Sequence, residues 1–387
     1  ALPIFLGDSV VNEYNSQVSA QIAKLNNGRW AVILGNGYNS TNEQPVLLIQ
    51  YLDGDRSLLK LSAATQGTEA AANGLSTPRL VDVNGDGTPD VVYAGDLRGN
   101  LWKFQIASAT PSNWGVAFNG NPLYTAAAPT NGNISQRQPI TTAPLVRMGS
   151  SVAGLMVAFG TGRNVTAADT TNTHTQSFYS IVDSTRYEVQ TTGSDTGRVR
   201  ELASATSGAV GTGRQALVER SFNATPIAGA NASQDQTFWN MGDQATLDYA
   251  AGKKGWFLDL PESGERVVRA PRFYAAGGNV IEILSDSPQA AEDLTVERCE
   301  PSTAPPKAWR TLLGIEFGNR PTQQLLDPSG DGVYNAVSDS NANRMATGTK
   351  GISLRAKGDR VNIGNISTER TNDLARPYTS LNWRQMQ

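Results

Sequence analysis

Histidine and cysteine are nearly missing from this chain of 387 residues, which contains one of each, His174 and Cys299. Structural zinc sites need four ligands drawn mainly from these two residue types, so the chain cannot build one by itself. It cannot form an internal disulfide bond either. A Ser-His-Asp or Cys-His catalytic arrangement would have to use His174, whose polar neighbours Thr173 and Thr175 predict an exposed loop instead.

Charged residues are also scarce. They make up 17% of the chain, against roughly 25% in an ordinary soluble domain. The net charge is -3 and the sequence pI is near 5.4. Proteins that bind nucleic acid normally carry a basic surface, so we expect no nucleic-acid partner.

Long hydrophobic runs are absent as well. The most apolar stretch lies around residues 153–159, which is far shorter than the roughly 18 residues that a membrane-spanning helix needs. The chain starts without an initiator Met and without the basic segment of a signal peptide. We therefore expect a soluble, C-terminal fragment of a longer protein, with any targeting signal upstream.

The chain is instead rich in short apolar segments that contain many β-branched and aromatic residues. Clusters of Gly, Asn, Asp, Ser and Thr separate them, a pattern typical of an all-β protein. The clearest predicted strands cover residues 31–34, 46–51, 91–94, 101–106, 155–159, 178–182, 256–260 and 280–284.

These predicted strands recur in a similar order. A Pro followed by apolar residues is found at Pro78, Pro144 and Pro271, and the next strand ends at a Gly such as Gly95 or Gly160. A period of about 40 to 60 residues with about four short strands predicts a β-propeller, here one domain of about seven blades over residues 1–387. Residues 107–140 and 184–252 predict irregular loop insertions, with a short helix near residues 244–250.

One nine-residue segment carries most of the chemistry that can be inferred from the sequence. In Asp82-Val83-Asn84-Gly85-Asp86-Gly87-Thr88-Pro89-Asp90, oxygen-bearing side chains occupy positions 1, 3, 5 and 9, and Gly occupies position 6. The EF-hand loop uses the same spacing and the same Gly. Asp82, Asn84, Asp86 and Asp90 would bind through side chains, and Thr88 through its carbonyl. A set of oxygen ligands with three carboxylates favours Ca²⁺ over Zn²⁺ or Cu²⁺.

The segment departs from an EF-hand in two respects. Position 12 is Tyr93 where the bidentate Glu should be, and the flanking residues predict strands instead of helices. A plain Asn-Gly or Asp-Gly hairpin turn is the alternative interpretation. A weaker copy of the spacing covers residues 327–335, where a polar turn is the first expectation and a second calcium site the alternative.

The calcium loop and the residues that follow it, through Tyr93, Trp102 and Phe104, resemble the C-terminal domain of the PilY/PilC family of type IV pilus tip-associated biogenesis factors and adhesins. The segments 255–260 and 264–268 and the ending 381–384 support the resemblance, which spans nearly the whole chain. It implies a modified β-propeller. Some members of the family pair an integrin-type tripeptide with calcium, but here Arg98-Gly99 is followed by Asn100 instead of the expected Asp.

The resemblance also implies a function and a location. It suggests a calcium-binding regulatory domain that controls pilus extension against retraction, surface (twitching) motility and adhesion. It implies a protein at the bacterial cell surface, associated with the pilus, in the outer membrane or secreted. Its partners would be pilins or minor pilins, together with a host-cell surface. Asp82, Asn84, Asp86, Thr88 and Asp90 would be the Ca²⁺ ligands.

Two other functions stay open at this point. One is an enzyme on a related propeller, of the quinoprotein type, which also uses calcium. The other is an adhesin in which calcium only stabilises the fold. No paired catalytic acids or phosphate-binding Gly loop stand out, so we expect a binding module and not an enzyme. We expect that Asp90→Ala weakens calcium binding and leaves the fold intact.

Overall fold

A computed structural model describes residues 21–63, 73–130, 133–202, 209–230, 237–242, 244–274, 278–288, 307–348, 352–356, 359–363 and 368–370. Cys299 and the ending 381–384 lie outside these residues. The chain divides into two compact units. The first contains residues 1–161, 180–216 and 380–387, and the second contains residues 162–179 and 217–379. The expectation of one domain over the whole chain stays a prediction.

Strands dominate the described residues, which confirms the all-β prediction. Strands that lie in the first unit are β1 (Gln21–Lys24), β2 (Trp30–Gly35), β3 (Val46–Tyr51), β4 (Leu58–Ser62), β5 (Arg79–Val81), β6 (Val91–Gly95), β7 (Asn100–Gln105), β8 (Gly115–Val116), β9 (Tyr124–Thr125), β10 (Ala127–Thr130), β11 (Asn133–Arg137), β12 (Leu145–Met148), β13 (Leu155–Gly160), β15 (Tyr187–Val189), β16 (Val199–Glu201) and β17 (Gly211–Thr212).

The second unit holds most of the remaining strands. They are β18 (Val218–Arg220), β19 (Ile227–Ala228), β20 (Thr237–Asn240), β21 (Gly255–Asp259), β22 (Arg272–Phe273), β23 (Val280–Ser287), β24 (Lys307–Gly314), β25 (Ala342–Gly348), β26 (Ile352–Ala356), β27 (Asp359–Ile363) and β28 (Thr368–Arg370). Strand β14 (Ser177–Asp183) contributes residues to both units. Each strand that the sequence predicts is present.

Helical structure is nearly absent from the described residues. It is limited to 3₁₀ turns at Pro111–Asn113 and Ala167–Thr171 and to α1 (Ala117–Gly120). In α1 the residues Phe118 and Asn119 have positive φ values of 53° and 57°, so the segment is a tight turn and not a regular helix. No helix in the described part of the chain is long and apolar enough to cross a membrane.

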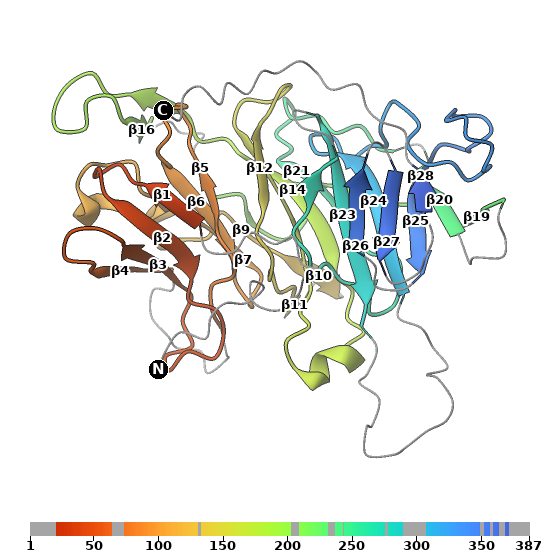
Figure 1. The fold of residues 1–387 in the computed structure, drawn as a ribbon, viewed down its shortest axis with the longest axis horizontal. Helices are drawn as coiled ribbons and strands as arrows, with labels where there is room; N and C mark the ends of the chain where they lie inside the picture. The colour runs from red at the N-terminus through yellow and green to blue at the C-terminus, as the bar shows by residue number, and fades with distance from the viewer. Residues whose placement is uncertain are drawn as a thin grey trace. The chain divides into compact units, whose positions relative to one another are not determined.

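Two sheets share the core of the first unit (Figure 1), and their neighbouring strands are antiparallel except for β9 and β17, which are parallel. The order β1-β2-β3-β4 is an up-and-down meander, and the second sheet has the order β17-β9-β7-β6-β5 with β8 at its side. Alternate residues of β2, such as Ala31 and Ile33, are fully buried, as expected for a strand with one face on the core. They pack in one cluster with Val92 of β6 and Phe104 of β7.

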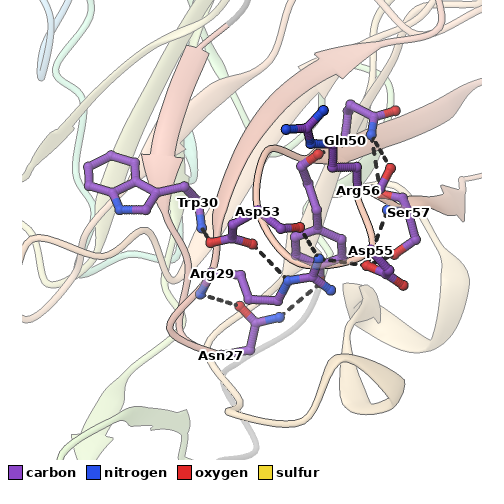
Figure 2. Close-up of polar contacts among 9 residues, drawn as sticks. Asn27, Arg29, Trp30, Gln50, Asp53, Asp55, Arg56 and Ser57 are labelled. Carbon is purple, nitrogen blue, oxygen red and sulfur yellow. Dashed lines mark hydrogen bonds and ion pairs between the residues drawn. The ribbon is translucent and has the colours of Figure 1, made fainter.

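A charged cluster closes the turn between β3 and β4 (Figure 2). The Arg29 side chain forms ion pairs with Asp53 at 2.9 Å and Asp55 at 2.7 Å. Its guanidinium also stacks 3.7 Å above the centre of the Tyr51 ring. The backbone N–H of Trp30 donates to the second oxygen of Asp53. The cluster links β2 to the β3–β4 turn at the surface.

The second unit is built on a six-stranded sheet with the order β19-β20-β25-β24-β23-β22, in which all neighbours are antiparallel. Its apolar core gathers around Leu312 and Met345. The polar residues of this sheet are also buried. The Arg344 guanidinium donates to both carboxylate oxygens of Glu265 at 2.9 Å and lies over the rings of Trp239 and Trp309.

The predicted loop insertions are wrong in part. Residues 107–140 contain β8 to β11, and residues 184–252 contain β15 to β20. These strands are mostly two to four residues long, and several pair with partners far away in the sequence, such as β9 with β17 and β20 with β25. The helix predicted near residues 244–250 is also absent, because this segment follows an irregular path that ends in a turn.

Candidate functional site

The nine-residue acidic segment connects β5 to β6, which are antiparallel neighbours in the first unit. Val81 pairs with Val91 at the point where the two strands separate. The backbone N–H of Asp90 donates to the Val81 carbonyl at 2.9 Å. The segment is therefore a long hairpin connection between two strands, as predicted, and the departure from the helix-flanked EF-hand is confirmed.

Asp82 organises the first half of the loop. One of its carboxylate oxygens accepts from the N–H of Gly85 at 2.7 Å, and the other accepts from the N–H of Gly87 at 2.7 Å. Gly85 and Gly87 have φ values of +77° and +89°, a backbone conformation that costs glycine little and other residues more. The two glycines allow the chain to curl so that its N–H groups point toward one carboxylate.

Asn84, Asp86 and Thr88 form the middle of the loop, where Asp86 is exposed and the other two are half-buried. The Asn84 amide nitrogen donates to Asp86 at 3.0 Å. The N–H and the hydroxyl of Thr88 both donate to the other oxygen of Asp86, at 2.8 and 2.6 Å. The sequence pattern assigned the Thr88 carbonyl as a ligand, and that assignment stays a prediction.

Asp90 differs from the other loop acids because it is fully buried. One carboxylate oxygen accepts from the N–H of Val83 at 2.8 Å, and the other lies 3.4 Å from the Asn26 amide nitrogen. The pKa of Asp90 is raised to about 6, mainly by burial and in smaller part by the negative charges of Asp82 and Asp86, while the hydrogen bond from Val83 lowers it. A buried carboxyl with raised pKa beside two other acids is a place where a cation would be stabilised.

Two residues far from the loop in sequence support it, and the sequence pattern did not identify them. Asn26, which is 3% exposed, donates to the Pro89 carbonyl at 2.9 Å and accepts from the Thr88 hydroxyl at 3.2 Å. The Arg198 guanidinium donates twice to the Asn26 carbonyl, at 2.8 and 2.6 Å. An isolated Asn and an isolated Arg carry no pattern in the sequence, so only the fold reveals this bracing.

The donor set of the loop fits a hard cation, although its carboxylates point mainly at backbone N–H groups. Among the residues that the structure describes, no three or more His, Cys, Asp or Glu side chains gather closely enough to ligate a metal. Asp82 and Asp86 are exposed, whereas Asp90 is buried. Carboxylate, amide and carbonyl oxygens are the ligands that Ca²⁺ uses in proteins.

The second acidic loop has the same hydrogen-bonding pattern as the first. The two oxygens of Asp327 accept from the N–H groups of Gly330 at 2.7 Å and Gly332 at 2.9 Å. Asp331 accepts from the N–H of Val333 at 2.7 Å, as Asp86 does from Thr88. The two loops thus share a turn, and the second has fewer carboxylates at the ligand positions.

A buried acid closes the second loop from a position that the spacing did not include. Asp339 is fully buried and accepts from the Ser329 hydroxyl at 2.9 Å and the Asn335 N–H at 2.9 Å. It lies four residues beyond the end of the pattern that the sequence suggested. Asp339 therefore has the role in the second loop that Asp90 has in the first.

Two other sequence features are now placed. His174 is exposed in an irregular segment, which confirms the loop prediction. Asn100, the third residue of the tripeptide that resembles an integrin ligand, is 9% exposed. Its amide donates to the buried Asp96 carboxylate at 2.8 Å. The side chain is therefore part of the interior of its sheet.

Comparison with known proteins identifies the family. Residues 10–206, just over half of the chain, match the model of the PilY1 beta-propeller domain. The chain is similar to the type IV pilus biogenesis factor PilY1 of Pseudomonas aeruginosa strain PAO1, at 30% identity over 363 residues. It is similar to a PilY1 homolog of Xylella fastidiosa strain Temecula1 at 41% identity over 175 residues, 42% of this chain and 12% of that protein.

A solved structure supports the same assignment. The crystal structure of the Pseudomonas aeruginosa PilY1 C-terminal domain aligns with 91% of this chain and 72% of that chain, with a TM-score of 0.68 and 25% sequence identity. The alignment with the whole PAO1 protein covers 87% of this chain and 28% of the length of that protein. The family and the β-propeller fold expected from the sequence are both confirmed, and the number of blades stays a prediction. The chain belongs to the PilY1 beta-propeller family.

Proposed function

We propose that this chain is the calcium-responsive regulatory domain of a type IV pilus biogenesis protein. In this proposal calcium binding by the loop between β5 and β6 controls pilus extension against retraction, and through it twitching motility and adhesion. The observation that carries the proposal is the buried Asp90 carboxyl. Its pKa is raised to about 6 by burial and by Asp82 and Asp86, so a divalent cation at the loop would relieve a charge that the fold leaves uncompensated.

The surroundings of the loop supply a route by which its charge can affect other parts of the first unit. Asn84 donates to the carbonyl of Gly197 at 3.4 Å, which lies at the tip of the β15–β16 hairpin. Arg198 of the same tip holds the Asn26 carbonyl, and Asn26 contacts Thr88 and Asp90. A bound calcium ion would supply two positive charges. Asn84 could then bind the ion through its amide oxygen while its amide nitrogen donates to Gly197, which would link the loop to the hairpin.

The proposed role is binding and assembly, without enzymatic activity. Relatives named as pilus biogenesis factors support it. The proposed partners are pilins or minor pilins, with a host-cell surface as a further target. The proposed location is the bacterial surface, either on the pilus, in the outer membrane or in the secreted fraction.

Calorimetric titration with Ca²⁺ tests the first step. Asp86→Ala is the preferred variant because Asp86 is exposed, whereas Asp90→Ala would leave the buried Val83 N–H without its acceptor. We expect Asp86→Ala to weaken calcium binding at least tenfold, because a hydrogen-bonding or ionic contact to a charged ligand contributes roughly 1.5–3 kcal/mol. Equal affinity of Asp86→Ala and wild type would contradict the ligand assignment.

Asp331→Ala is the matched control, because Asp331 occupies the equivalent position of the second loop. We expect it to leave the affinity of the first loop unchanged. Loss of one of two bound ions in Asp331→Ala would identify the second loop as a further calcium site.

The regulatory step needs the full-length protein in its bacterium. We expect a strain with Asp86→Ala to differ from wild type in surface pili per cell and in twitching-zone diameter when calcium is abundant, at equal protein levels. If calcium protects the chain from proteolysis but Asp86→Ala leaves pili and motility unchanged, the ion only stabilises an adhesin. A cofactor absorbance band in the purified protein would favour the quinoprotein alternative.

A further inference from the structure

A cavity of about 240 Å³ lies directly behind the candidate calcium loop, within the first unit. It is lined by Asp90 and Val91, by Gln105 of β7, and by Tyr187 and Glu201 of the β15–β16 hairpin. Pockets for drug-sized ligands occupy roughly 300–1,000 Å³. A smaller cavity of this kind fits a single side chain or a small molecule with a similar number of atoms.

The cavity is lined by more negative than positive charge. Three carboxylates line it, from Asp90, Asp195 and Glu201, and Arg200 is the one cationic residue of the lining. The Arg200 guanidinium is paired with Glu188 outside the lining. Asp195 accepts from the Ser108 hydroxyl at 3.1 Å and the Ala109 N–H at 2.6 Å, and it has no cationic partner among the described residues.

The cationic side chains near the cavity already interact with other groups of the protein. Lys103 is fully buried, and its ammonium lies between the carboxylates of Asp183 at 2.8 Å and Glu201 at 2.7 Å. One positive charge therefore serves two acids. The guanidinium of Arg198 on the covering hairpin is directed at the Asn26 carbonyl. The acids that line the cavity are thus left with a net negative charge.

Tyr187 is a further polar residue of the cavity lining. Its oxygen is buried, and a hydrogen bond with Glu201 contributes to its raised pKa, after the larger effects of burial and of the Asp183 charge. A tyrosine hydroxyl that donates to a carboxylate still has lone pairs with which it can accept a hydrogen bond from a ligand. The Tyr187 ring already tolerates one ammonium, because the Lys103 nitrogen lies 5.2 Å from its centre.

We propose that this cavity binds a primary ammonium group on a short alkyl stem, such as the lysine side chain of a partner polypeptide. The three N–H donors of an ammonium match the Tyr187 oxygen and the carboxylates of the lining, of which Asp195 has no cationic partner among the described residues. The apolar wall of Val91, Ala107 and Val199 suits the methylene groups of the stem. An anionic group would be repelled by the same acids. The inference goes beyond the calcium proposal and shares one residue with it, Asp90.

The test is a titration of the isotope-labelled chain with Nα-acetyl-lysine methylamide, followed by NMR. The norleucine analogue, which lacks the ammonium, is the matched probe. We expect saturable shifts at the amides of Tyr187 and Asp195 with the lysine probe only. Asp195→Asn should weaken binding about tenfold and Tyr187→Phe several-fold, in line with the contribution of hydrogen bonds to a charged group.

Glu219→Gln, at an exposed position in the second unit, is the matched control and should bind like wild type. Unfolding temperatures of all variants show whether the cavity is preserved. Glu201→Gln is avoided because it would remove a partner of the buried Lys103. Equal binding of the norleucine probe, or unchanged affinity in both cavity variants, would overturn the inference.

Two further experiments distinguish the possible sources of the ammonium group and separate this proposal from the calcium proposal. Tighter binding of a lysine-containing pentapeptide than of n-butylamine supports a polypeptide partner, and equal binding supports a free amine. The titrations are repeated with Asp86→Ala and with calcium chelated. If ammonium binding is retained when Asp86→Ala or the chelator has removed calcium binding, the result supports the ammonium site independently of the calcium proposal. Loss of ammonium binding in Asp195→Asn and Tyr187→Phe, with calcium affinity unchanged, shows that the two sites are separate.

Discussion

The Lys103 ammonium lies 2.8 Å from the Asp183 carboxylate, and both side chains are buried almost completely. The Tyr93 and Thr185 hydroxyls also donate to Asp183, each at 2.5 Å. Burial alone would raise the pKa of Asp183, but Lys103 and these hydrogen bonds hold the pKa below its usual value. Lys103 therefore supplies the positive charge on which this buried network depends.

Lys103→Met should destabilise the chain strongly, because it leaves Asp183 and part of Glu201 as uncompensated charges in the interior. Loss of one partner of a buried ion pair costs roughly 3–5 kcal/mol. Urea unfolding followed by circular dichroism measures the change in the free energy of unfolding. Lys60→Met, at an exposed position of β4, is the control and should change it little. Similar values for the two variants would show that the ion pair contributes nothing.

The stability of the calcium-free protein should depend on the protonation of Asp90. Its folded-state pKa of about 6 lies above the ordinary value of 3.8, so ionisation is disfavoured in the fold. The stabilising contribution is complete below about pH 4 and is lost as the pH rises through 6. We expect wild type in chelator to melt at a higher temperature at pH 5 than at pH 7, relative to Asp90→Asn. A wild-type melting profile parallel to that of Asp90→Asn would contradict this.

Calcium affinity should have the opposite pH dependence. A cation needs ionised ligands, and protons compete with it for Asp90. We expect the affinity to fall about tenfold for each pH unit below 6, if Asp90 alone accounts for the competition. Calorimetry at pH 5, 6 and 7 measures the effect. A constant affinity over this range would exclude Asp90 as a ligand.

Gly95 packs so closely against a neighbouring segment that it cannot accept a side chain. A Cβ atom at this position would lie 2.2 Å from the Ile140 Cγ2 atom. We expect Gly95→Ala to cost roughly 1–3 kcal/mol of unfolding free energy, as overpacking in a core does. At Gly115 a Cβ would meet no atom within 4 Å, so Gly115→Ala should be nearly neutral. Thermal melts of both variants measure the effect. Equal melting temperatures for Gly95→Ala and Gly115→Ala would contradict the close contact at Gly95.

Asn100→Asp would complete the integrin-type tripeptide in the sequence, but we expect it to lower the stability of the fold. The Asn100 amide donates to Asp96 at 2.8 Å, and a second carboxylate there would meet the buried one without a proton between them. We expect a loss of stability at pH 7 that becomes smaller toward pH 4, where one of the two acids is protonated. Asn119→Asp, at an exposed position, is the control. A stable Asn100→Asp protein that binds integrin would contradict the assignment of Asn100 to the interior.

The strands that could be predicted from the sequence are those with long apolar runs of their own. β6 and β13, for example, are buried over their whole length, and their composition alone indicates a strand in a core. Strands such as β9 and β17 have two residues each. Their pairing joins residues that lie 87 positions apart, such as Tyr124 and Gly211, which no local pattern encodes. This explains why residues 107–140 were expected to be loops.

The same contrast holds at the candidate site. The ligand spacing and the two glycines lie within nine consecutive residues, so the loop and its strand flanks could be predicted. The burial of Asp90 depends on Asn26 and on the covering hairpin, and the cavity behind it depends on Tyr187 and Glu201. These residues come together only through the fold. Asp339 was missed for a simpler reason, because it follows the second loop outside the expected spacing.

The double hydrogen bond between Arg198 and the Asn26 carbonyl joins positions that are 172 residues apart. During synthesis the segment around Asn26 leaves the ribosome long before Arg198 is made. The acidic loop between them consequently exists for some time as nascent chain without its final bracing. Its complete environment can form only once residue 198 has emerged, so stable loading with an ion would be a late event in the maturation of the protein.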